Sequence, residues 1–314
     1  MGSTEIVKHI NRNYWMGWAM ILIIICHIQY TCYDDSFFMK YMRLLFRKGE
    51  FGVDIFLFLS SVGLSYSIEK NSLRDFYIHR VKRLFPMYFV FLFLSFVFFK
   101  SRENIVRDIL YQITGISNFT GNQFNEWYIP ALIIIYAVFP LLYSGVSRFY
   151  RHYKYYSVLL VVITIYGYII TNEFMTSFFA RRLYVIVLGV VIYFAHQNGG
   201  KFEVLEILSI IAMIQLFVPS ECNMFLLVPL LLVLFDSFFP ILPMHKILSL
   251  IGKHSLEIYL GQTIGLIYFC SQSSLTILYK LPMGLLITIV TSFILWGIHN
   301  GFYKCIDKYK EYKF

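Results

Sequence analysis

The chain has 314 residues, of which 58% are hydrophobic and only 14% are charged, and its formal net charge is +9. Its mean hydropathy of +0.65 is far above that of an ordinary soluble domain, which excludes soluble hydrolases and NTPases. In so apolar a chain, Lys and Arg are typical of cytoplasmic loops and lipid headgroups, so nucleic acid is not an expected partner. We therefore predict an integral membrane protein whose main partner is the lipid bilayer.

Apolar runs of about 17 to 20 residues recur along the chain, which is the length that a helix needs to cross a bilayer. The runs lack the alternation of barrel strands, so the predicted fold is all-α, a polytopic transmembrane helical bundle. Ten spans are expected, at residues 14–32, 51–68, 84–100, 127–147, 156–171, 183–196, 203–218, 222–240, 255–270 and 283–303. Because the connections are short, residues 1–314 are predicted to form a single membrane-embedded domain.

The distribution of Lys and Arg predicts the orientation of the bundle. With a cytoplasmic N-terminus, the inner segments hold 17 of the 27 basic residues, and an even number of spans makes the C-terminus cytoplasmic as well. The two largest outer loops, residues 33–50 and 101–126, mix charged, amide and aromatic residues. This mixture suits a hydrophilic acceptor, and it is equally typical of an ordinary solvated surface.

The first predicted span carries one ionisable residue well inside it, His27. A histidine is costly in hydrocarbon, so a functional role is the default hypothesis. Asp54 lies at a comparable depth in the antiparallel second span, since a helix rises 1.5 Å per residue. A carboxylate there can orient His27 for general-base catalysis. The alternative is structural, with Asp54 capping its helix and His27 bonding a neighbouring helix.

A basic cluster precedes the third predicted span. Arg80 and Arg83 are three positions apart and share a helix face. Such a pair can bind the phosphates of a cytosolic donor. It can equally act as a positive-inside anchor for the span that follows.

Two later spans also contain residues that point to a cavity. Trp127 fits an interfacial aromatic belt, and Pro130 and Pro140 predict a kinked or broken fourth span of the kind that often lines a cavity. Polar residues in the ninth span are expected to face the bundle instead of lipid. These residues are Glu257, Tyr259 and Gln262. The five cysteines show neither a CxxC pair nor a zinc spacing with histidine, so no metal site is predicted.

Six stretches, at residues 15–27, 51–63, 80–88, 127–140, 182–189 and 250–260, follow one another in a recognisable order. Together they resemble the motifs of the integral-membrane acyltransferase-3 family, which includes bacterial surface-polysaccharide and peptidoglycan O-acetyltransferases. The most specific match is FGVDIFLFLS, which is similar to the family's GVDxFFxLSG motif. The resemblance covers nearly the whole chain.

The resemblance implies that an acyl group, usually acetyl, passes from cytoplasmic acetyl-CoA or another acyl-CoA to a hydroxyl of a cell-surface or lipid-linked glycan. It implies that His27 is the general base or acyl-transfer residue, with Arg80 and Arg83 near the donor. Acyl-CoA is then a substrate, and no permanently bound cofactor is expected. The expected location is the bacterial inner membrane. Residues expected at the cavity or the acceptor are Trp127, Arg182, Tyr259 and Gln262.

The chain departs from the family pattern at two positions. Met16 stands eleven positions before His27, where the family commonly has a basic residue, and Arg12, one turn earlier, is the expected substitute. Gln262 replaces a late histidine and keeps its hydrogen bonding without its proton exchange. Two alternatives follow: a transporter or flippase for an acyl group or lipid-linked sugar, or an inactive scaffold subunit.

Overall fold

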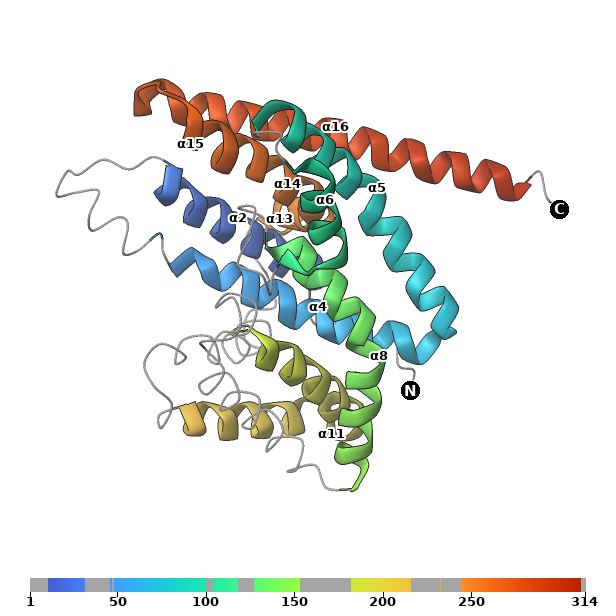
Figure 1. Ribbon diagram of the computed structural model, residues 1–314. Coiled ribbons are helices and arrows are strands. Elements are labelled where there is room, and N and C mark those ends of the chain that lie inside the picture. Colours follow the sequence, from blue (N-terminus) through green and yellow to red (C-terminus); the bar gives the residue numbers. More distant parts are fainter. Residues whose placement is uncertain are drawn as a thin grey trace.

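The computed structural model describes residues 11–31, 46, 48–99, 104–117, 127–152, 182–215, 232 and 244–311. Within these ranges every regular element is helical and no strand occurs, as predicted (Figure 1). The predicted spans at residues 156–171 and 222–240 lie outside the described residues, apart from residue 232. The number of ten spans and the orientation of the termini therefore stay predictions.

The elements run as α2 (Arg12–Thr31), η1 (Lys48–Glu50), α4 (Phe51–Lys70), α5 (Leu73–Phe99), α6 (Ile105–Thr114), α8 (Tyr128–His152), α11 (Leu183–Gln215), α13 (His245–Lys253), α14 (Ser255–Gln262), η2 (Thr263–Phe269), α15 (Cys270–Gln272) and α16 (Ile277–Glu311). Among the described helices, α4, α8 and the Leu278–Lys304 part of α16 are long and apolar enough to cross a membrane. Figure 1 shows α16 along the upper edge of the bundle, and its exposed side chains include Leu286 and Phe293. An apolar outer face of this kind suits contact with lipid.

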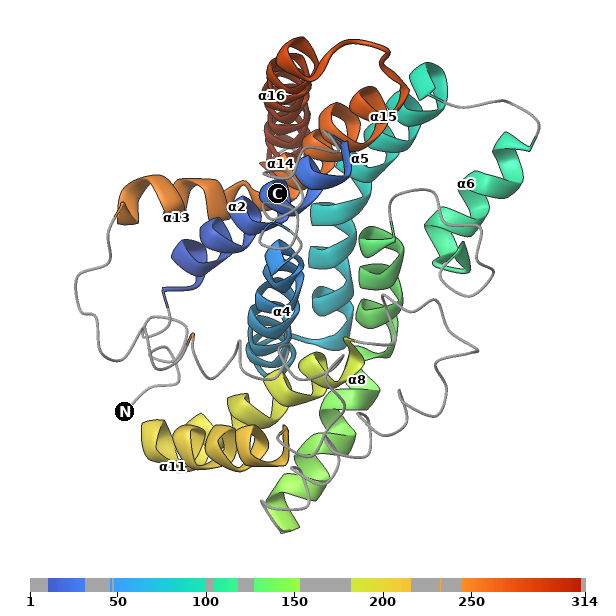
Figure 2. The same cartoon turned by 90° about the vertical axis from the view of Figure 1, so that its left-hand side faces the viewer.

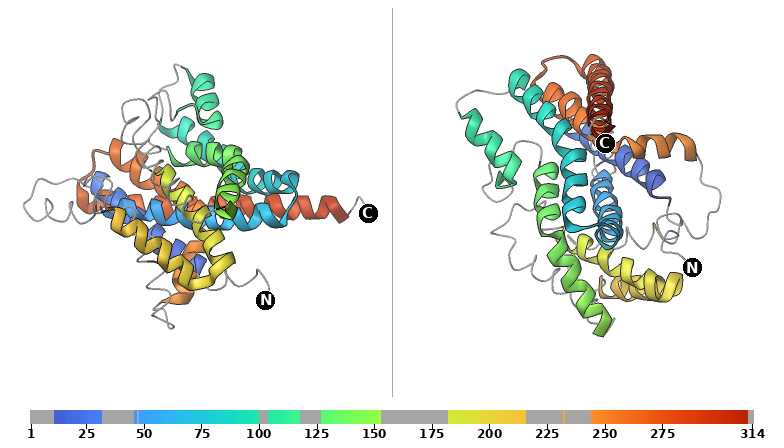
Figure 3. Two further views of the ribbon diagram at one scale, coloured as in Figure 1. Left: turned by 90° about the horizontal axis from the view of Figure 1, so that it is seen from below. Right: turned by 90° about the vertical axis from the view of Figure 1, so that its right-hand side faces the viewer.

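Most predicted spans in the described ranges correspond to helices of similar bounds. The ninth is a composite of α14, η2 and α15, in which η2 is a π-helix. The sixth predicted span and residues 203–215 of the seventh fall within the single element α11, whose two halves meet at a sharp bend in Figures 1 and 3. The sequence Gly199-Gly200 separates the two predicted spans, and paired glycines are a common cause of helix bending.

One sequence-based expectation is corrected. The outer loop predicted at residues 101–126 contains the helix α6, which packs Ile109 and Ile113 against the core and ends at Gly115 in the left-handed conformation (φ 78°). The helix α13 occupies part of the connection between the eighth and ninth predicted spans. The fourth predicted span corresponds to the continuous helix α8, in which Pro130 lies in the first turn, where a proline is tolerated, and Pro140 lies inside, where a proline is a common cause of a kink.

Close backbone packing holds α2 in the middle of the bundle, between α4 and α13 (Figure 2). A Cβ atom added at Gly17 would overlap the carbonyl of Leu248 on α13, and one added at Gly252 would overlap the carbonyl of Asn13. Gly52 of α4 meets α2 in the same way at Ala19. Small residues permit this approach, which is how transmembrane helices commonly pack.

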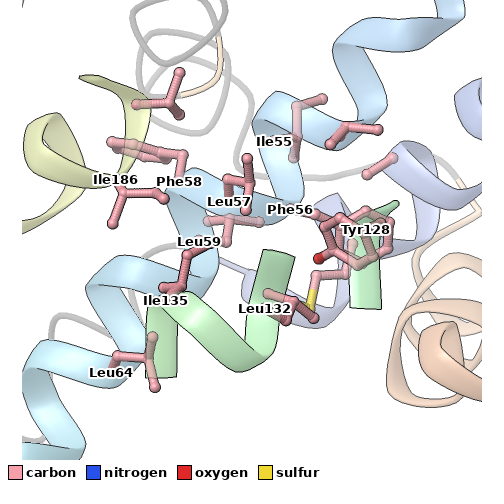
Figure 4. Close-up of a cluster of buried hydrophobic side chains, with 14 of the residues drawn as sticks. Ile55, Phe56, Leu57, Phe58, Leu59, Leu64, Tyr128, Leu132, Ile135 and Ile186 are labelled. Carbon is pink, nitrogen blue, oxygen red and sulfur yellow. The ribbon is translucent and has the colours of Figure 1, made fainter. Parts of the chain in front are cut away.

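The apolar core joins α4 to α8 and α11. Figure 4 shows that Phe56, Leu59 and Leu64 of α4 lie beside Leu132 and Ile135 of α8. All five side chains are buried. This packing sets the separation between α4 and α8, and therefore the width of the space between them and α2.

Candidate active site

A cavity of about 320 Å³ lies among α2, α4, α5, α8 and α14. Its lining residues are Arg12, Met16, Phe56, Ser60, Gly63, Leu64, Tyr66, His79, Arg80, Arg83, Leu84, Tyr128, Leu132, Tyr136, Ser255, Leu256 and Tyr259. Cationic side chains from α2 and α5 gather towards one end, beside Gly63. Phe56, Tyr128 and Tyr259 form an aromatic group towards the other end, and Tyr128 is still close enough to Arg12 to act on it electrostatically.

Arg12 brings a positive charge from the first turn of α2 into the cavity. A Cβ atom added at Gly63 would lie 3.5 Å from the Arg12 Nε, so the glycine leaves room for the guanidinium. The Nε atom is buried and has no hydrogen-bond partner among the described residues. Arg80 and Arg83 lie close enough to act on Arg12 electrostatically. The prediction that Arg12 reaches this site is therefore consistent with the geometry, and Met16 lines the same cavity one turn further along.

Arg80 is held by its own helix. It donates from Nη1 to the carbonyl of Phe76 at 3.3 Å, and its guanidinium lies 4.2 Å from the centre of the Phe76 ring. Arg83 lines the cavity beside it. The predicted common face of the two arginines is observed, and the buried Nε of Arg12 beside them is a place where a positive charge without an anion is unfavourable. This end of the cavity is therefore suited to an anionic ligand.

His27 lies towards the far end of α2, where it contacts α14. Its Nδ1 is 2.6 Å from the Oε1 of Gln262. The Nε2 of Gln262 donates to the hydroxyl of Thr263 at 3.2 Å, and that hydroxyl donates to the carbonyl of Tyr259 at 3.0 Å. This chain orients the amide so that Oε1 accepts from Nδ1, which leaves Nε2 of His27 as the basic nitrogen of the neutral ring.

Asp54 has a different charged partner from the predicted His27. Its Oδ1 is 3.2 Å from the Nε of Arg182, and both side chains are buried. Arg182 also approaches Glu50 at 3.7 Å and lies 5.4 Å from the centre of the Trp127 ring. The helical rise predicts that His27 and Asp54 lie at the same depth, but the direction in which each side chain leaves its helix axis decides whether they meet. The predicted pairing of Asp54 with His27 is thus corrected: Gln262 is the observed hydrogen-bond partner of the histidine.

The residues expected around the cavity divide into two groups. Tyr259 lines the cavity, and Gln262 contacts His27 one turn beyond it. Trp127 and Arg182 belong to the neighbouring cluster around Asp54.

The π-helix η2 begins directly after Gln262, and π-helical turns are frequent at functional sites. Sequence reasoning did not predict this π-helix.

A second buried polar pair lies outside the cavity. Glu257 is only 4% exposed, as predicted for a residue that faces the bundle, and its Oε1 is 2.7 Å from Nδ1 of His299 on α16. This contact ties α14 to α16. Among the residues that the structure describes, no group of three or more His, Cys, Asp or Glu side chains could hold a metal ion.

Comparison with known protein families identifies the family of this chain. The acyltransferase-3 family, described as an acyltransferase domain, matches residues 13–299 of the chain. The match includes His27, Gln262 and most of the cavity, and it begins one residue after Arg12. The chain therefore belongs to the acyltransferase-3 family and is a membrane acyltransferase. No curated protein and no solved structure matches it significantly.

Proposed function

We propose that the protein is a membrane O-acyltransferase that moves an acyl group from acyl-CoA to a hydroxyl of a cell-surface or lipid-linked glycan. The observation that carries this proposal is the cluster of Arg12, Arg80 and Arg83 in a cavity that α14, the helix in contact with His27, also lines. Family membership supports acyl transfer in general. The donor, the acceptor and the residue roles are inferred from the chemistry of the site.

The cationic end of the cavity supports a coenzyme A donor. Coenzyme A carries a diphosphate and a 3′-phosphate, and arginine binds phosphate oxygens through pairs of N–H donors. Arg12 offers a buried Nε with no partner among the described residues, and Arg80 and Arg83 stand beside it. Phosphate oxygens would supply the missing hydrogen bonds and neutralise the crowded positive charge.

The distance between the two ends of the site supports the same donor. Arg12 and His27 are fifteen positions apart on α2, which corresponds to about 22 Å along the helix axis. The extended phosphopantetheine arm of coenzyme A is of comparable length. Between the ends, Met16, Leu132 and Leu256 provide an apolar wall for that arm. A donor whose phosphates lie at the arginines can therefore direct its thioester towards His27.

The chemistry needs one base. Nε2 of His27 removes the proton from the acceptor hydroxyl while its oxygen attacks the thioester carbonyl carbon. The C–S bond breaks, the coenzyme A thiolate leaves with the electron pair and takes a proton, and an ester bond to the acceptor remains. Gln262 holds the ring in the tautomer in which Nε2 is basic. A neutral amide performs this orienting role without exchanging a proton.

We further propose that the arginines face the cytoplasm, where acyl-CoA is available, and that the protein lies in a bacterial inner membrane. The distribution of Lys and Arg supports this orientation. The acceptor approaches from the side of the Trp127 cluster. Arg182 is 2% exposed and paired with Asp54, so it shapes this region from within the bundle.

The test is transfer of radiolabelled acetyl groups from acetyl-CoA to candidate glycans by the purified protein. We expect label on the glycan with the wild type and none with His27→Ala. His152→Ala is the matched control, because His152 is an exposed histidine at the end of α8 and should retain activity. If the label stays on coenzyme A with the wild type while acetyl-CoA binds, acyl transfer is disproved in favour of a transporter or an inactive scaffold subunit. Equal labelling with His27→Ala would disprove the proposed role of His27.

A further inference from the structure

The aromatic end of the cavity is closed by two tyrosines. Tyr128 is the first residue of α8 and Tyr259 lies in α14, and their ring centroids are 5.0 Å apart with a 57° tilt. The ring of Phe56 of α4 lies 6.4 Å from that of Tyr128 with the planes tilted by 52°, and Figure 4 shows the two side chains next to each other. Each tyrosine is only 6% exposed. Three helices therefore contribute to an aromatic wall across this end.

His27 lies beyond that wall. Neither His27 nor Gln262 is among the residues that line the cavity. Gln262 follows Tyr259 by three positions, which is about one helical turn, and it is the residue that contacts His27. A thioester that enters from the arginine end must therefore pass Tyr128 and Tyr259 before it reaches the proposed base.

We propose that Tyr128 and Tyr259 determine which acyl group reaches His27, and that they restrict the donor to short acyl groups such as acetyl. This inference rests on the proposed function. Aromatic rings are large and rigid, and these two have neighbours that limit their displacement. Tyr128 also packs edge-on against Trp127 at 5.9 Å. A small movement of the rings admits a two-carbon group, whereas a longer chain must displace the packed rings further.

The ring faces, and not the hydroxyl groups, are the selective element. Replacement of either tyrosine by phenylalanine preserves the ring and should preserve the selectivity. Replacement by alanine opens the wall and should admit longer chains. Tyr136 offers a matched control, because it lines the same cavity beside the arginines, and Tyr136→Ala enlarges the cavity at the opposite end.

The experiment measures the binding of S-alkyl-CoA thioethers with two to eight alkyl carbons to the purified full-length protein by calorimetry. These analogues cannot transfer a group, so the result does not depend on catalysis. For the wild type, affinity should fall as the chain lengthens. In Tyr259→Ala and Tyr128→Ala, the affinity for the eight-carbon analogue relative to the two-carbon analogue should rise about tenfold or more, the scale on which apolar pockets discriminate added methylenes. In Tyr259→Phe, Tyr128→Phe and Tyr136→Ala this ratio should stay at the wild-type value.

Two results would overturn the inference: a wild-type affinity that does not fall with chain length, or the wild-type ratio in both alanine variants. Tyr259→Leu and Tyr128→Leu replace the alanine variants if those do not fold, and the same criterion applies to them. The proposed function fails separately, when the wild type transfers no acetyl group to any glycan although the two-carbon analogue binds.

Discussion

The arginine of the first helix offers the sharpest test of the donor site. The Nε of Arg12 is buried and makes no hydrogen bond with the described residues. Replacing Arg12 with alanine therefore removes a charge that is unfavourable to bury and breaks no observed hydrogen bond at Nε. We expect the thermal stability of the unliganded protein to be unchanged or higher, while the affinity for coenzyme A falls.

The size of the loss follows from the bond that the ligand would make. A hydrogen bond to a charged group contributes about 1.5–3 kcal/mol. Since each 1.4 kcal/mol is a factor of ten, Arg12→Ala should weaken coenzyme A binding by about 10- to 150-fold. Calorimetric titration with coenzyme A measures the affinity, and a thermal melt without ligand measures stability.

A second-site change separates a specific role from a general loss of charge. Met16 lines the same cavity one turn along α2, so Arg12→Ala combined with Met16→Arg returns a guanidinium to the cavity wall. We expect this double variant to recover most of the lost affinity. Lys82→Ala is the matched control, because it removes one positive charge next to Arg83 from a residue that does not line the cavity. Equal weakening by Lys82→Ala, or unchanged binding in Arg12→Ala, would refute the reasoning.

Two further predictions concern residues deeper in the bundle. Gln262→Leu removes the acceptor for Nδ1 of His27 and should lower kcat by about 100-fold with little change in KM, which is the scale of a misplaced general base. Gln262→Glu keeps an acceptor oxygen and should lower kcat less. A kcat for Gln262→Leu equal to that of the wild type would contradict the orienting role. Asp54→Ala leaves Arg182 buried without its carboxylate partner and should destabilise the protein by about 3–5 kcal/mol. The double variant Asp54→Leu with Arg182→Met should be more stable than Asp54→Ala in a thermal melt, and the reverse order would show that the pair is not a structural unit.

Some features of the site follow from local sequence patterns. Arg80 and Arg83 share a helix face because their spacing is close to one turn, and both do line the cavity. Glu257 is buried, as expected for a charged residue within an apolar helix. The order of six short motifs predicted the family, which the match over residues 13–299 confirms.

Other features depend on contacts between segments far apart in the chain. His27 and Gln262 are separated by 235 positions, and no local pattern relates them. The depth of Asp54 along its helix was predictable, but the direction of its side chain, which meets Arg182, was not. The helix α6 was missed because it lacks the long apolar run by which spans are recognised. The π-helix η2 lies within the ninth predicted span, where an apolar run predicts a helix but not its π-helical hydrogen bonding.

The sequence by itself determined that this is an all-helical membrane protein of the acyltransferase-3 type, with a histidine inside its first helix and arginines before its third. These properties follow from hydropathy, spacing and charge, which are local. Only the tertiary structure decided which groups meet: Arg12 with the two arginines of α5, His27 with Gln262, and Tyr128 with Tyr259. The physical reason is that such contacts depend on how helices cross and rotate, and close backbone packing at residues such as Gly17 and Gly252 sets that arrangement for α2.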